Sequence, residues 1–115
     1  MNKDYDTNNA FLVARLQHLL PVEFCNKYGL SPDVYSSNAI TIESDYLYNY
    51  QEANKKSEQI AEMFFKEHYF RNNNGLEVIL DSGIPTIGVF ENNDNNQIVK
   101  FTRIESFHII KIKGV

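Results

Sequence analysis

Residues 44–71 read SDYLYNYQEANKKSEQIAEMFFKEHYFR, and this stretch decides the fold that the sequence predicts. A set of mostly apolar residues recurs here at spacings of four and three, which places the set on one stripe of a long helix. The stripe consists of Tyr46, Tyr50, Ala53, Ser57, Ile60, Phe64 and His68, and it is widened by Leu47, Ala61 and Phe65. A face of this width needs a sheet or several helices to cover it.

After Gly75 the period of the apolar residues changes from about 3.6 to 2, which indicates strands. We predict four of them, over residues 76–80, 84–91, 97–104 and 107–113. Turns are expected at Asp81-Ser82-Gly83 and in the loop 92–96, with a tight connection at Glu105-Ser106. The strands would form an antiparallel meander that packs on the long helix.

The last predicted strand is apolar on both faces. Phe107 and Ile109 alternate with Ile110 and Ile112, so burial on one side leaves a second apolar face. The long helix accounts for one of these faces. Short N-terminal helices, a second copy of the chain or a partner protein must cover the other.

The first 43 residues predict short helices. Phe11, Leu12, Leu16, Leu19 and Leu20 repeat at helical spacing, so a first helix would run to Leu20 and end at Pro21. The range 22–28 predicts a second helix that ends at Gly29, and the range 31–37 a third short helix or a turn. Ala39 to Glu43 reads as a short strand or an extended lead. The expected fold is α+β in a single domain over 1–115, with short helices over 1–43, one long central helix over 44–71 and a four-stranded antiparallel sheet over 75–113.

Composition narrows the class of protein. The chain has 115 residues, 43% of them hydrophobic, and a formal net charge of −4. Because no segment carries the cluster of basic residues that phosphate neutralisation requires, the charge argues against a nucleic-acid partner. One cysteine, no long apolar run and a polar N-terminus lead us to expect a soluble cytoplasmic protein.

Residues 22–35 resemble the helix-turn-helix pattern of small DNA-binding domains. In this resemblance Cys25 is the small residue, Gly29-Leu30-Ser31-Pro32 the turn, and Tyr35 the buried position of the second helix. A nucleic-acid-binding regulator acting through residues 22–38 is therefore the alternative function, and its contacts would come from Arg15, Lys27, Ser36 and Asn38. The second helix lacks the Arg or Lys that major-groove readers use, which favours a packing hairpin.

Catalytic patterns are weak in this chain. Cys25 could act as a nucleophile only beside His18, His68 or His108, and no spacing links them. The acids Glu77, Asp81 and Glu91 with Lys100 give a loose resemblance to metal nuclease sites, but without their Glu-x-Lys spacing. A Cys–His or metal-dependent hydrolase is thus kept only as an alternative, and we expect no enzyme, no metal site and no cofactor.

Aromatic residues exceed what one helical stripe can bury, and such residues often anchor interfaces. The candidate partner-binding residues are Tyr46, Tyr48, Tyr50, Phe65, Tyr69 and Phe70. The sequence therefore favours a noncatalytic protein-binding module, such as a small acidic inhibitor, an immunity or anti-defence protein, or an accessory subunit. Its partner would be another protein, and a basic or nucleic-acid-handling protein would suit the acidic charge of the chain. A homodimer is compatible with the same features.

Overall fold

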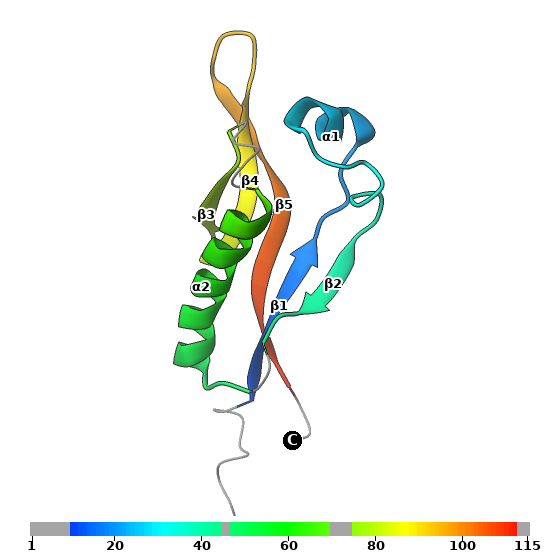
Figure 1. The fold of residues 1–115 in the computed structure, drawn as a ribbon. Helices are drawn as coiled ribbons and strands as arrows, with labels where there is room; N and C mark the ends of the chain where they lie inside the picture. Colours follow the sequence, from blue (N-terminus) through cyan, green and yellow to red (C-terminus); the bar gives the residue numbers. More distant parts are fainter. Residues whose placement is uncertain (1–9, 45–46, 70–74, 113–115) are drawn as a thin grey trace, which may run out of the picture.

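The computed structural model describes residues 10–44, 47–69 and 75–112. These residues form an α+β fold with one antiparallel sheet of five strands, one short helix and one long helix (Figure 1). The elements in chain order are β1 (Phe11–Gln17), α1 (Val22–Tyr28), β2 (Ala39–Ile42), α2 (Tyr50–His68), β3 (Glu77–Asp81), β4 (Ile84–Asn92) and β5 (Ile98–Lys111). The strand order is β2-β1-β5-β4-β3, so β2 and β3 are the two edges. The predicted fold class is confirmed, and the number of strands differs.

The long helix begins later than the sequence analysis expected. Asn49 caps α2: its side chain accepts a hydrogen bond from the Glu52 backbone N–H at 2.8 Å, and the Glu52 side chain accepts one from the Asn49 N–H at 3.2 Å. This reciprocal pair satisfies two backbone donors that the first turn would leave open. Before the cap, Tyr48 pairs with Phe11 in an antiparallel bridge. The predicted start at Ser44 was therefore wrong.

Residues 11–17 form a strand, and no helix runs from there to Leu20 as predicted. β1 pairs with β5 on one side and with β2 on the other, so it is a central strand of the sheet. Consecutive residues Val13 and Ala14 are both almost fully buried, which shows that both faces of β1 carry apolar side chains. A strand that is apolar on both faces loses the simple alternation that identifies a strand, and pairing with distant strands decides its conformation.

The two last predicted strands are one continuous strand of 14 residues, β5. The connection expected at Glu105-Ser106 was wrong, because both residues lie in the middle of β5 and are buried. A register shift opposite Ile87 and Gly88 marks a bulge at this point. Three C-terminal strands thus replace the predicted four, and β1 and β2 complete the sheet.

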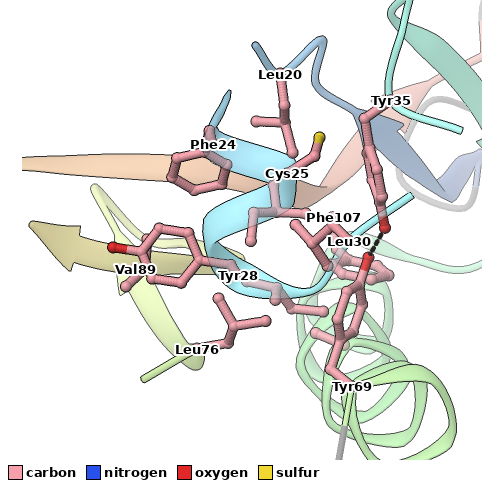
Figure 2. Packing of buried hydrophobic residues seen from close by; sticks show 13 residues of the cluster. Leu20, Phe24, Cys25, Tyr28, Leu30, Tyr35, Tyr69, Leu76, Val89 and Phe107 are labelled. Atoms are coloured by element: carbon pink, nitrogen blue, oxygen red, sulfur yellow. Dashed lines mark hydrogen bonds between the residues drawn. The ribbon is translucent and has the colours of Figure 1, made fainter. Parts of the chain in front are cut away.

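The hydrophobic core lies on one face of the sheet. Figure 2 shows Phe24, Cys25 and Tyr28 of α1 among residues from β4 and β5. The predicted helix over 22–28 is confirmed, and it ends at Gly29, whose φ of 71° is the left-handed value that this C-cap requires. Turns occupy the segment after Ser31. Ile60, Phe64 and Phe65 of α2 pack against the same cluster, so α1 and α2 lie on the same face.

We call the opposite side of β1, β2 and β5 the open face. Register places its residues side by side: Leu12 lies opposite Ile110, and Ala14 opposite Ile42 and His108. Its apolar residues are Leu12, Ala14, Leu16, Ile40, Ile42 and Ile110. Since residues 11–17 belong to the sheet and α1 joins the core on the other side, the described N-terminal elements do not cover the open face.

Candidate functional site

The open face differs from the usual outer face of an antiparallel sheet. An antiparallel sheet that has one face on a core normally shows polar residues on the other. Here Ile40 is 69% exposed and Ile42 53% exposed, and Ile110 lies on the same face across β1 from them. A shallow groove of about 290 Å³ runs between Ala14, Leu16, Ile40 and the strand segment 108–110. This apolar surface is a candidate for contact with another protein.

A row of hydrogen-bonding side chains borders the apolar part of the open face. The Ser106 Oγ lies 2.9 Å from the His18 Nε2 and 2.7 Å from the His108 Nε2. A hydroxyl has one proton, so Ser106 donates to one imidazole and accepts from the other. Ser106 is 2% exposed, and a serine nucleophile must reach its substrate. The row is therefore a polar anchor within the sheet.

Burial keeps both histidines neutral. Desolvation lowers the pKa of His18 below its usual value of 6.5, and the nearby positive charge of Arg103 and the neighbouring His108 lower it further. Desolvation also lowers the pKa of His108. Neutral imidazoles suit an apolar contact surface, because an apolar partner would penalise a charge there.

Acid should therefore destabilise the fold through this row. In the unfolded chain His18 and His108 bind protons from about pH 6.5 downward, whereas in the folded chain they do so only at lower pH. The stability that they contribute is fully present above about pH 6.5 and is lost as the pH falls through their folded-state pKa values. Urea unfolding across this range should show a decrease that is smaller in a His18→Gln/His108→Gln variant. Equal pH profiles for the two proteins would contradict this explanation.

A second polar cluster lies on the core side of the sheet, around the buried carboxylate of Glu105. Arg15 donates from Nη1 to Glu105 Oε1 at 2.9 Å and from Nε to Glu43 Oε2 at 2.7 Å. The hydroxyl of Tyr69 donates to Glu105 Oε2 at 2.6 Å, and the Tyr35 hydroxyl is bonded to that of Tyr69 (Figure 2). Glu105 is 2% exposed, so the cluster joins β1, β5, the end of α2 and the segment after α1.

Burial, together with the Glu105 carboxylate, holds the tyrosines of this cluster protonated by raising their pKa. Burial raises the pKa of Tyr69, and the adjacent Glu105 carboxylate raises it further. Burial likewise raises the pKa of Tyr35. For Arg15, burial acts to lower the pKa, but the hydrogen bonds to Glu43 and Glu105 outweigh it and raise the pKa overall. The cluster is thus a charge-paired, protonated network that stabilises the fold away from solvent.

The predicted partner-binding aromatics are distributed over different environments. Tyr48 and Tyr69 are buried, Phe65 is half-buried against the core, and Tyr50 is 56% exposed and stacks edge-on with Phe11. Tyr46 and Phe70 lie outside the described residues. The structure thus does not gather this set on one surface, and a partner-binding role for them stays a prediction.

The alternative nucleic-acid contacts are not brought together either. Arg15 is engaged by Glu43 and Glu105, Ser36 bonds the Asp33 carbonyl, and Asn38 accepts from the Leu19 N–H. Lys27 is exposed and lies over the Tyr28 ring. Because the segment after Ser31 forms turns, the described chain lacks the second helix of a helix-turn-helix at this place.

The geometry of the described residues gives little support to the catalytic alternatives. Cys25 is fully buried, and burial raises the pKa of its thiol, which opposes formation of a thiolate nucleophile. Within the described residues, no group of three or more His, Cys, Asp or Glu side chains is arranged to hold a metal ion. Lys100 pairs with Glu91, and Asp81 with Arg103.

Neither described helix has the length and apolar character needed to cross a membrane.

Sequence reasoning expected a second apolar face on the last strand, but it missed that β1 and β2 belong to this face, and it missed the role of Glu105 for the same reason. Leu16 and Ile40 come from segments assigned to different elements, and only the pairing of β1 with β2 places them together. A weak signal was present: Arg15, Glu105 and Ser106 interrupt apolar runs that otherwise read as buried. Polar residues at such positions indicate buried partners.

The chain was compared with known proteins at three levels. No family model matches it, no curated protein matches it, and no solved structure matches it.

Proposed function

We propose that this protein is a noncatalytic protein-binding module that engages another protein through its open face. The observation that carries the proposal is the exposure of Ile40 and Ile42 on the same face as Leu16 and Ile110, in a sheet whose described helices both lie on the other side. Removal of apolar area from water is favourable by about 25 cal/mol per Å² before the entropic costs of association are counted, so a face of this kind gains most from an apolar counterpart. An inhibitor, an immunity protein or an accessory subunit would use the open face to bind its partner.

The chemistry of the face selects the kind of partner. Arg103 and Asp81, which lie on the same side of the sheet farther along, form an ion pair with each other. His18 and His108 are kept neutral by burial. With its charges paired or suppressed, the open face fits a partner that presents an apolar patch with few charges of its own. No specific observation favours the helix-turn-helix alternative.

Site-directed photo-crosslinking in the cells that express the protein tests this proposal. A benzoylphenylalanine at position 40 or 110 should give one major adduct, whereas the same group at Lys55 on the exposed side of α2 should not. Adding Ile42→Lys should reduce the adduct at least about tenfold, equivalent to about 1.4 kcal/mol of binding free energy. Ile42 is already largely exposed, so this variant should keep its stability in urea unfolding.

Three results would overturn the proposal. The first is the absence of an adduct from positions 40 and 110, and the second is equal labelling from Lys55. The third is an adduct of two 13.4 kDa chains, which would make a second copy the occupant of the open face. Sedimentation of the purified chain gives an independent measure of that last result.

A further inference from the structure

A second candidate binding site is a groove between α2 and the edge strand β3. It has a volume of about 640 Å³ and is lined by Glu58, Gln59, Glu62 and Met63 of α2, by Val78, Ile79 and Leu80 of β3, and by Pro85. Met63 and Leu80 are each about 60% exposed, at 60% and 59%. The groove therefore has an apolar floor, and it lies on the core side of the sheet, away from the open face.

The backbone of β3 has hydrogen-bonding groups that point away from β4, at the edge of the sheet that borders this groove. Ser82 and Gly83 both have positive φ, at 54° and 83°, which is the two-residue hairpin turn that makes Asp81 and Ile84 a hydrogen-bonded pair. In an antiparallel ladder such pairs alternate with pairs that make no bond to each other. Val78 and Leu80 fall in the second kind, so their N–H and C=O groups face the open edge.

The same two residues direct their side chains into the groove. Val78 lies opposite Ile87, which is in the core, and Leu80 lies opposite Pro85, which lines the groove. An extended segment added along β3 would thus bond the backbone of Val78 and Leu80 and place every second side chain on the apolar floor.

The charge of the α2 side of the groove indicates which side chains its occupant carries. Glu58 and Glu62 stand one turn apart on the α2 wall of the groove, and both are exposed. Within the described part of the chain neither carboxylate forms an ion pair. A second copy of β3 would bring the same two acids against themselves, and like charges oppose that arrangement. A segment with Lys or Arg on either side of an apolar residue would pair with them.

We propose that the groove between α2 and β3 binds an extended segment of a partner protein, which adds a strand to β3 and directs an apolar side chain flanked by basic ones toward Met63, Glu58 and Glu62. The proposal goes beyond the proposed function, because this site and the open face lie on opposite sides of the sheet. Main-chain bonding supplies affinity in such complexes, and the side-chain pockets supply specificity.

A synthetic peptide tests the inference on the intact chain. The probe is a seven-residue threonine peptide with valine at its centre and a lysine and an arginine two positions to either side, which places all three on one face. Its binding should slow hydrogen exchange at the Val78 and Leu80 amides at least about tenfold. Methylating the peptide nitrogens that face β3 should weaken binding at least about tenfold, because it removes the added ladder.

Matched charge variants separate the groove from general attraction to an acidic protein. Glu62→Lys should weaken the basic peptide at least about fivefold and improve binding of the same peptide with glutamates in place of its two cations. The control is Glu67→Lys, which makes the same charge change on the same helix but outside the groove lining. Its effect on the binding free energy of the basic peptide should be less than about half of the effect of Glu62→Lys. Salt should weaken the wild-type complex.

Several results would overturn the proposal. These are equal binding of the cationic and anionic peptides, binding that survives N-methylation, and equal effects of Glu62→Lys and Glu67→Lys. Dimerisation of the free chain that protects the Val78 and Leu80 amides would assign the edge to a second copy instead. Crosslinking from the open face is independent of all these measurements, so failure of one proposal is distinguishable from failure of the other.

Discussion

The Glu105→Ala variant should lose about 3–5 kcal/mol of unfolding free energy, which is the usual effect of removing one partner from a buried ion pair. The substitution removes the acceptor of Tyr69 and one of the two acceptors of Arg15. It leaves the hydroxyls of Tyr35 and Tyr69 with each other alone in a buried site. Urea unfolding of the purified chain, followed by far-UV circular dichroism, measures the loss.

The matched control is Glu43→Gln. Glu43 bonds the same arginine but is 21% exposed, so its removal should lower the unfolding free energy by about 1 kcal/mol or less. A Glu105→Gln variant keeps the shape and an acceptor oxygen, and should lie between the two. A loss of less than 1 kcal/mol in Glu105→Ala would contradict the assignment of Glu105 as the residue that ties four segments together.

The second large effect is expected at Gly88 in β4. A Cβ atom there would lie 2.3 Å from the Thr102 carbonyl oxygen and 2.6 Å from Cζ of the Phe101 ring. Because the nearer atom belongs to the backbone of the adjacent strand, the clash cannot be relieved by a side-chain rotation. Gly88→Ala should therefore lower the unfolding free energy by about 2–3 kcal/mol, at the upper end of the range for overpacking.

Gly83→Ala is the control for this prediction. Gly83 has a φ of 83° but nothing lies within 4 Å of its added Cβ, so the cost is limited to backbone strain of about 1–2 kcal/mol. Hydrogen exchange should also differ, with amides of β4 and β5 near the bulge opening more readily in Gly88→Ala than in Gly83→Ala. A stability of Gly88→Ala equal to wild type would mean that the strands move apart without penalty.

The accuracy of the sequence analysis varied with the range of the interactions that fix each element. The helix over 22–28 has a local start at Pro21 and a local stop at Gly29, and it was predicted correctly. The hairpin of β3 and β4 has a local turn at Ser82-Gly83 and was placed to within one residue at each end. The start of α2 was also available locally, in the Asn49–Glu52 capping box, and was overlooked.

The candidate surfaces show the opposite behaviour. Ile40 and Ile42 face the same side as Leu16 and Ala14 only because β2 pairs with β1 in one register. Glu105 and Arg15 are 90 residues apart in the sequence, so nothing local indicated that one would neutralise the other. Polar residues in the middle of β5 resembled a turn because their partners could not be seen.

By itself the sequence determined the long helix and the change to strands after Gly75, since these depend on periodicity and turn residues. Tertiary structure alone decided that residues 11–17 are a central strand, that 98–111 is unbroken, and that neither described helix covers the second face of the sheet. The physical reason is that a run with apolar residues on both faces has no period of its own. Its conformation follows from the strands that donate hydrogen bonds to it, and these lie far away in the chain.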